Sequence, residues 1–267
     1  MKIKHFISSI IKSFVMAFSM FSILPMPIIE WKKENLTYML CALPCVGVFI
    51  GIIFCLWQQL CQWLHFGNFL YAIGMTLLPL VLSGGIHMDG FCDTVDALSS
   101  HAPVERKREI LKDSHAGAFA IIFTVAYFLT YAACCSELHS TIFTACMLGL
   151  HQIFARSIGA FAGIQFPSAA TGGLLASFKA AANKKAVFLL TCWNLICVVC
   201  MILLSPISGI TCTITAIICL LYVHRLAQKE FGGMSGDLAG YLITISQLAL
   251  LICFMITERM VTICFSL

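Results

Sequence analysis

The chain has 267 residues, of which 60% are hydrophobic and 10% are charged, and its mean hydropathy is +0.97. This composition supplies too little polar surface for a water-soluble globule of this size, so it excludes a soluble protein and predicts an integral membrane protein. The net charge is +4, and Lys and Arg lie in short clusters between apolar runs, a pattern that indicates membrane topology and no nucleic-acid partner.

The first apolar segment, residues 7–29, differs from those that follow. It contains Lys12 and several serines, ends at Pro25 and Pro27, and is preceded by Lys2 and Lys4. If this segment crossed the membrane, the two leading lysines would lie outside the cell. We therefore expect an amphipathic helix in the cytoplasmic interface, with an eighth span as the alternative.

Seven later apolar runs are long enough to cross ~30 Å of hydrocarbon as helices. They lie near residues 36–65, 69–86, 116–135, 141–165, 186–204, 207–223 and 238–257. Since no linker divides the chain, we expect one polytopic domain over residues 1–267. Its fold class is all-α, with about seven transmembrane helices and the N-terminal amphipathic interfacial helix.

The polar connections between these runs alternate in basic content. Those at 30–35, 87–115, 166–185 and 224–236 contain Lys or Arg, whereas the intervening connections contain none. The positive-inside rule places the basic connections on the cytoplasmic side. We therefore expect a multi-pass protein of the cytoplasmic membrane whose candidate active-site segment, residues 84–117, faces the cytoplasm.

Fifteen cysteines are scattered through the chain, mostly within apolar runs. Cys197 and Cys200 have CxxC spacing, but no second pair and no nearby histidine accompanies them. A zinc or redox site is therefore disfavoured, and these residues are expected to act as small hydrophobes.

The segment 84–96, with the sequence GGIHMDGFCDTVD, concentrates residues that can do chemistry. In a helix, Asp89, Asp93 and Asp96 would lie within ~60° of one another on one face, where their charges repel. A hard divalent cation such as Mg²⁺ would compensate, because it prefers carboxylate oxygens and bridges them to phosphates. The alternative is a solvated acidic loop with Asp89 as a helix cap.

Two further features surround these acids. The glycines of the segment, Gly84, Gly85 and Gly90, permit an unusual turn or a close backbone approach. His87 is a candidate general base, because an unperturbed pKa of ~6.5 suits proton removal near neutrality.

The next segment, residues 105–115, mixes charges at helical spacing. Most of it is expected to form an ordinary solvated helix, including Glu105, Arg106, Lys107 and Glu109. The following residues, Lys112, Asp113 and Ser114, lie where the chain re-enters the membrane, so they can meet a phosphate and a metal ion held by the first motif.

Two polar features interrupt the C-terminal half. Arg156 lies well inside the run 141–165, so it is a candidate phosphate-binding group, with a structural ion pair as the alternative. The turn at 231–237 places Gly233, Gly236 and Asp237 at a helix start, where backbone amides can bind phosphate. Capping of that helix by Asp237 is an equal alternative.

Together these segments resemble the cobalamin synthase family, also called adenosylcobinamide-GDP ribazoletransferase. The resemblance rests on residues 84–97, 111–117 and 232–237 and extends over most of the chain, including Leu24-Pro25-Met26-Pro27. It implies a Mg²⁺-dependent membrane transferase that joins adenosylcobinamide-GDP to α-ribazole, or to α-ribazole 5′-phosphate, and releases GMP. A homo-oligomer is left open.

Under this resemblance the candidate residues take three roles. The metal ligands are Asp89, Asp93 and Asp96. The catalytic residues are His87, Lys112 and Asp113, with Asp113 either completing the metal shell or acting as the base. Substrate binding falls to Gly84, Gly85, Ser114, Arg156, Gly233, Gly236 and Asp237.

The chain also departs from the family pattern. Phe91, His115 and Ala120 stand where a small residue, an arginine and a glycine are usual, and Thr244 and Gln247 stand where acids are expected. These departures leave the metal motif intact and affect secondary contacts to phosphate or substrate.

Three other classes of membrane protein share some of these features. A CDP-alcohol phosphotransferase needs an Ala-Arg pair at the positions that Asp93 and Thr94 occupy in this chain. A membrane prenyltransferase needs two aspartate-rich motifs that begin with Asn-Asp, and these motifs are missing from the sequence. A proton-coupled transporter could relay protons through Asp89, Asp93 and Arg156, but the sequence has no pair of interrupted spans that would indicate inverted repeats.

Overall fold

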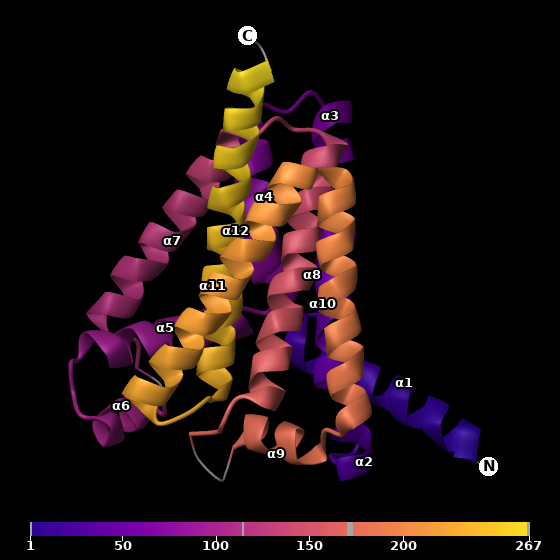
Figure 1. The fold of residues 1–267 in the computed structure, drawn as a ribbon, viewed down its shortest axis with the longest axis vertical. Helices are drawn as coiled ribbons and strands as arrows, with labels where there is room; N and C mark the ends of the chain where they lie inside the picture. The colour runs from indigo at the N-terminus through magenta and orange to yellow at the C-terminus, as the bar shows by residue number, and fades with distance from the viewer. Residues whose placement is uncertain (1, 114, 170–172, 266–267) are drawn as a thin grey trace.

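The computed structural model describes residues 2–113, 115–169 and 173–265, and within these ranges it contains helices and no strand. The predicted all-α membrane fold is confirmed. Figure 1 shows the helices in chain order: α1 (Lys2–Phe21), α2 (Lys33–Leu36), the 3₁₀ turn η1 (Leu40–Ala42), α3 (Leu43–Trp63), α4 (Asn68–Ser83), α5 (Ile86–Ser99), α6 (Val104–Ile110), α7 (Ala118–Ser136), α8 (Ile142–Gln165), α9 (Leu174–Ala181), α10 (Lys184–Leu204), α11 (Pro206–Phe231) and α12 (Gly236–Phe265).

Five segments among the described residues are long and apolar enough to cross a membrane, judged by length and composition. They are Lys33–Trp63, Ala118–Ser136, Lys184–Leu204, Pro206–Phe231 and Gly236–Cys264. A sixth span results if α4 and α5 are counted as one broken span, but the chain bends by 94° at the break between the two helices. The remaining predicted span corresponds to α8, which has 24 residues and contains His151, Gln152 and Arg156.

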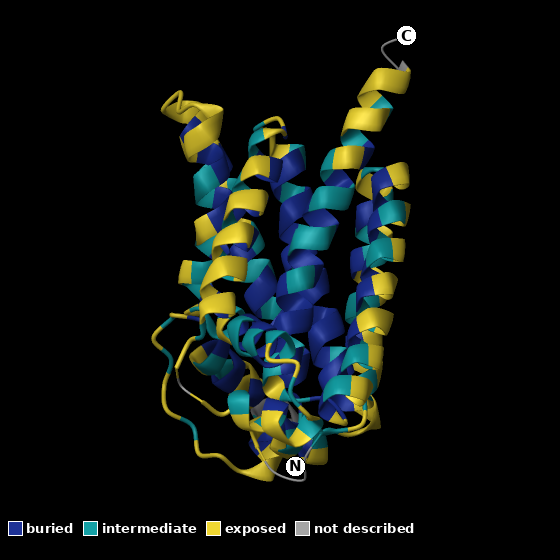
Figure 2. Ribbon diagram, turned by 90° about the vertical axis from the view of Figure 1, so that its left-hand side faces the viewer, coloured by how far each residue is buried: buried dark blue, intermediate teal, exposed yellow. Residues whose placement is uncertain are grey.

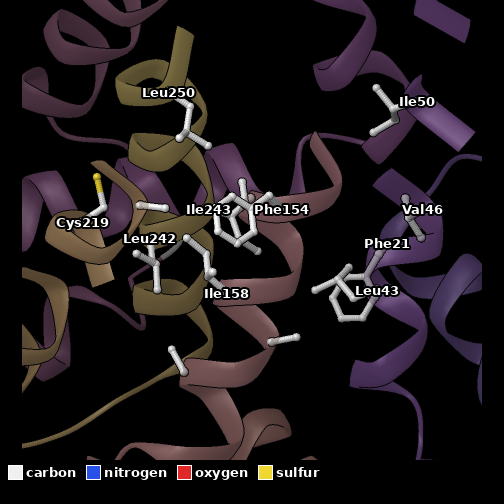
Figure 3. Packing of buried hydrophobic residues seen from close by; sticks show 14 of the residues in the cluster. Phe21, Leu43, Val46, Ile50, Phe154, Ile158, Cys219, Leu242, Ile243 and Leu250 are labelled. Carbon is white, nitrogen blue, oxygen red and sulfur yellow. The ribbon is translucent and has the colours of Figure 1, made fainter. Parts of the chain in front are cut away.

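Helix α8 lies at the centre of the bundle, packed against α3, α10 and α12 (Figure 1). Phe154 and Ile158 of α8 meet Ile243 of α12 in the buried core (Figure 3). On its other side Gly149 lies against Gly51 of α3, so closely that a Cβ on Gly149 would meet a backbone atom at 2.9 Å. Small residues at this crossing permit backbone contact, as is common between membrane helices.

The outward faces of the peripheral helices are exposed (Figure 2), and they carry many large apolar side chains. Leu203 of α10 is 78% exposed and Leu129 of α7 is 67% exposed. A water-soluble protein rarely exposes so much apolar surface, whereas lipid solvates it. The exposed faces therefore fit the predicted bilayer environment.

The basic connections share one end of the bundle. Helices α2, α6 and α9, which carry Lys33, Arg106 and Lys179, lie at the end opposite the C-terminus (Figure 1). At the same end α5 turns away from α4 through Gly84 and Gly85, whose φ angles of 64° and 78° are left-handed. The predicted unusual turn is confirmed, and α5 lies across this end of the bundle.

Helix α1 extends outward from this end as well (Figure 1). Its apolar part, Ser9–Phe21, is too short to be counted with the spans, as the interfacial interpretation requires. The side chain of Ser13 donates to the carbonyl of Asn35 at 2.6 Å, and the amide of Ile23 donates to the carbonyl of Leu82 at 3.0 Å. These bonds fix α1 to α2 and to the end of α4.

Candidate active site

The three predicted acids lie on one continuous helix, α5, because Gly90 does not interrupt it. Gly90 serves instead to bring two helices together, since a Cβ there would lie 2.7 Å from the carbonyl oxygen of Asp237 in α12. One turn further along α12, Gly240 lies against the backbone of His87. This contact places Asp89, at the start of α5, beside Asp237, at the start of α12.

Asp237 does not cap α12. The cap is Ser235, whose hydroxyl accepts a hydrogen bond from the amide of Leu238 at 3.2 Å. The interpretation of Asp237 as a helix cap is therefore wrong. Asp89 is not a cap either, because it lies in the first turn of α5 and Gly85 precedes the helix. The carboxylates of Asp89 and Asp237 both line the same cavity.

Asp96 has a structural task. One of its oxygens accepts a hydrogen bond from the amide of Gly117 at 2.6 Å, and the other accepts one from the amide of Ala120 at 2.8 Å. A carboxylate at a helix N-terminus satisfies amides that have no partner inside the helix and interacts favourably with the helix dipole. Asp96 therefore joins α5 to the start of α7.

Asp93 lies half-buried between the other acids, on a helix outside the five spanning segments. Its pKa is raised to about 7, mainly by burial and then by the nearby negative charges of Asp89, Asp237, Asp96 and Asp113, in that order. An acid cluster with this property favours either a shared proton or a cation. In the described ranges, no group of three His, Cys, Asp or Glu residues is already arranged as a metal-binding cluster.

The residues after α6 are exposed. One oxygen of Asp113 accepts hydrogen bonds from the backbone amide and the ring Nδ1 of His115, at 3.0 and 2.7 Å, and these bonds lower the pKa of Asp113. Lys112 lines a cavity that also contains Asp237. Ser114 lies outside the described residues.

The predicted solvated helix, α6, is only partly solvated. Arg106 and Glu109 form an exposed ion pair at 2.7 Å, as expected. Lys107 is buried, however, and pairs with Glu230 at the end of α11, so its assignment to the solvated face is wrong. The adjacent Arg108 donates from Nε to the carbonyl of Phe231 at 2.7 Å. Paired charges at this junction hold α6 against α11.

The glycines of the turn between α11 and α12 differ in their surroundings. Gly233 has a φ of 146°, and a Cβ on it would lie 2.5 Å from backbone atoms of Ser168 and Ala169, so its task is close packing. The amide of Met234 donates to the carbonyl of Pro167 at 2.7 Å, which fixes the same segment. Gly236 has open space around it and lines the cavity walls.

Arg156 is 1% exposed, and its guanidinium donates to the carbonyl and the side-chain oxygen of Gln152 at 3.0 and 2.8 Å. Among the described residues no carboxylate pairs with it, so the alternative of a structural ion pair is not found. Gln247, at a position where an acid was expected, also donates to the Gln152 side chain, at 2.9 Å. Arg156 faces a small cavity of about 30 Å³ that also touches His87 and Thr244, and it lines neither of the larger cavities beside Asp237.

Two larger cavities meet at Asp237. The first, which we name the apolar cavity, has a volume of about 280 Å³ and is lined mainly by apolar side chains, together with His87, Asp89 and Asp237. The second, which we name the basic cavity, has a volume of about 310 Å³ and is lined in part by Arg108 and Lys112. Their shared wall consists of Leu174, Leu175, Gly236 and Asp237.

His87 forms part of the apolar cavity. Its side chain is buried and stacks on Phe21 of α1, with ring centroids 5.9 Å apart. The ring atom Nε2 is buried without a hydrogen-bond partner. Burial, followed by the positive charge of Arg156, lowers the pKa of His87 well below its usual value. The imidazole is therefore neutral, with a free nitrogen for a bound hydroxyl, and it is a weaker base than an exposed histidine.

Several residues of these cavities were not predicted. Arg108 was not distinguished from the charged run around it, and Phe178 of α9 and Met20 of α1 resemble ordinary apolar positions. No local pattern in the sequence marks a cavity whose walls come from α1, α8, α9 and α12.

Residues 13–255 match the family described as cobalamin-5-phosphate synthase. A protein of Lachnoclostridium phytofermentans named adenosylcobinamide-GDP ribazoletransferase is 38% identical over 252 residues, which cover 94% of this chain and 96% of that protein. Proteins of the same name from Clostridium botulinum and Clostridium perfringens are 31% and 28% identical, over 90% and 88% of this chain and 95% and 94% of their own lengths. No solved structure matches.

Proposed function

The chain belongs to the cobalamin-5-phosphate synthase family, and we propose that it uses the acid cluster of α5 and α12 to join adenosylcobinamide-GDP to α-ribazole, or to its 5′-phosphate, with release of GMP. Adenosylcobinamide-GDP ribazoletransferase activity in cobalamin synthesis follows from the family membership. The observation that carries the proposed site is the meeting of two cavities of different chemistry at Asp237, with Asp89 beside it in the first cavity. The comparisons do not favour a CDP-alcohol phosphotransferase or a transporter.

The donor groups fit Mg²⁺. Asp89, Asp93 and Asp237 offer hard carboxylate oxygens, and within the described residues no Lys or Arg forms an ion pair with them. We assign these three carboxylates to the cation, with Asp96 fixed beside them by the amides of α7. When bound, Mg²⁺ supplies positive charge to the phosphate oxygens of the donor.

The reaction forms a bond between a ribose hydroxyl oxygen of the acceptor and the phosphorus attached to cobinamide, and it breaks the bond from that phosphorus to the GMP oxygen. The hydroxyl proton passes to a base, and His87 supports this role because it lines the apolar cavity and its Nε2 has no hydrogen-bond partner among the described residues. Asp113 fits the role less well, since it is exposed and bonded to His115. Lys112 stabilises the negative charge that develops on the leaving phosphate.

We also propose that the end of the bundle that carries α5 faces the cytoplasm. The basic residues of α2, α6 and α9 lie at this end, as the positive-inside rule requires. The protein would then lie in the cytoplasmic membrane and take both substrates from the cytoplasm.

Release of GMP by the purified protein in detergent tests this proposal. With adenosylcobinamide-GDP as the donor, we expect release that needs both Mg²⁺ and either α-ribazole or its 5′-phosphate, and that EDTA abolishes. GMP release that is independent of an acceptor would indicate hydrolysis and contradict the transferase assignment. Full activity in EDTA would contradict the metal assignment alone.

A further inference from the structure

The two cavities beside Asp237 differ in the chemistry of their walls. Among the described residues, no Arg or Lys lines the apolar cavity, whose walls include two aromatic side chains, Phe21 and Phe178. Its polar groups, His87, Asp89 and Asp237, offer hydrogen-bond acceptors to a bound hydroxyl. A site of this kind fits a flat apolar ring that carries hydroxyl groups.

The basic cavity fits a different ligand. Lys112 and Arg108 line it, and the exposed Gly236 at the start of α12 presents backbone beside them. Lys112 is exposed, and none of the hydrogen bonds or ion pairs found among the described residues engages its ammonium group. Arginine, lysine and the amides at a helix N-terminus are the groups that bind phosphates.

We propose that the apolar cavity receives the aromatic base and ribose of the α-ribazole acceptor, and that the basic cavity receives the guanosine phosphate that leaves. This assignment rests on the proposed function and deepens it. The attacked phosphorus then lies at the shared wall, beside Asp237. The acceptor oxygen bonds to it from the side of the apolar cavity, and the electron pair of the broken bond departs with GMP into the basic cavity.

The geometry of displacement at phosphorus supports this placement of the acceptor and the leaving group in separate cavities. Displacement at phosphorus requires the attacking and leaving oxygens to lie roughly in line on opposite sides. Two cavities that share a wall supply such opposite sides, and Asp237 in this wall lies between the apolar ring of the acceptor and the leaving phosphate. The reverse assignment would put a guanosine phosphate into the apolar cavity, away from Arg108 and Lys112, which line only the basic cavity.

Steady-state kinetics with each substrate varied in turn test the assignment. Ala160 on α8 lines only the apolar cavity, so Ala160→Leu fills part of that space. We expect the KM for α-ribazole to rise about tenfold, which corresponds to ~1.4 kcal/mol, with the KM for adenosylcobinamide-GDP changed less than about twofold. Lys112→Ala should raise the KM for adenosylcobinamide-GDP and leave the KM for α-ribazole nearly unchanged. It should also weaken the inhibition by the product GMP by about tenfold.

Controls separate these effects from general damage. Ala126→Leu on the exposed face of α7 and Lys184→Ala at the exposed start of α10 make the same chemical changes away from both cavities, and they should alter neither KM. Met20→Phe is a second way to fill the apolar cavity from α1 if Ala160→Leu does not fold. Lys112 is exposed, so its variant tests the basic cavity in either case.

The wild-type protein is measured first, because acceptor-dependent GMP release is the test of the proposed function. If that release is found, a rise in the donor KM for Ala160→Leu or Met20→Phe, or unchanged GMP inhibition for Lys112→Ala, overturns the cavity assignment and leaves the function in place. If no release is found in folded protein, the function fails, and binding of GMP alone to wild type and Lys112→Ala still decides whether the basic cavity is a nucleotide phosphate site.

Discussion

Substitution of Gly90 by alanine tests the contact that brings the two acid-bearing helices together. The new Cβ would lie 2.7 Å from the carbonyl oxygen and 2.9 Å from the Cα of Asp237, whereas ordinary van der Waals contact begins at 3.4 Å. Both neighbouring atoms belong to the backbone of α12, so no side chain can rotate away. The helices must therefore separate by several tenths of an ångström.

The separation has two measurable costs. Overpacking of this kind destabilises a fold by about 1–3 kcal/mol, so we expect thermal unfolding in detergent to occur at a lower temperature. It also moves Asp89 and Asp93 relative to Asp237, and a misplacement of about 1 Å at a catalytic centre lowers activity by about 10²-fold. The rate of GMP release measures this second effect.

Gly67→Ala is the matched control. Gly67 precedes α4 with an ordinary φ of −67°, and a Cβ there would meet no atom within 4 Å. We expect this variant to keep wild-type stability and activity. If Gly90→Ala also retained both, α5 and α12 would not need their close contact, and the account of the site would be refuted.

Substitutions at three further residues, Asp96, Lys107 and Asp93, test other contacts at this end of the bundle. Asp96→Ala removes both hydrogen bonds to the amides of α7 and should lower the free energy of unfolding by about 1–3 kcal/mol, and Asp96→Asn should lower it less. If chemical denaturation gave Asp96→Ala the same stability as wild type, these bonds would not hold α5 to α7. Lys107→Met leaves Glu230 without its buried partner and should cost about 2–3 kcal/mol, part of which the double variant Lys107→Met/Glu230→Met recovers; a double variant less stable than either single one would argue against the pair. Because the pKa of Asp93 is raised from 3.8 to about 7, the folded state without a cation holds a proton that the unfolded chain has lost, so the free energy of unfolding should fall as the pH rises between these values. Chemical denaturation at several pH values measures the slope of the unfolding free energy against pH, and Asp93→Asn should reduce this slope. An unchanged slope would mean that a group other than Asp93 titrates in this pH range.

The sequence allowed the membrane class, the positions of the apolar segments and the acid motif to be predicted, because these depend on local composition and helical spacing. The turn at Gly84 and Gly85 was foreseen for the same reason, since left-handed backbone favours glycine. The number of spans was harder to predict. A helix such as α8, buried by protein on several sides, is as long as a span but tolerates polar side chains.

Contacts between distant segments could not be predicted from the sequence. Lys107 appears in a run of alternating charges that is typical of a solvated helix, and only the fold shows that Glu230, 123 residues away, is its partner. Asp96 shares the spacing of the other acids, yet its oxygens are turned to the amides of α7. Helical periodicity specifies the face on which a side chain lies and leaves open what that face meets.

The most direct test of the central claim is the dependence of GMP release on Mg²⁺ concentration in wild type and Asp93→Asn, with adenosylcobinamide-GDP and α-ribazole 5′-phosphate both present. If the acid cluster holds the cation, wild type should respond to Mg²⁺ with a saturable rise in rate, and Asp93→Asn should lose about 10²-fold in rate or need about tenfold more Mg²⁺. A folded Asp93→Asn protein with the wild-type rate and the wild-type Mg²⁺ response would contradict the account.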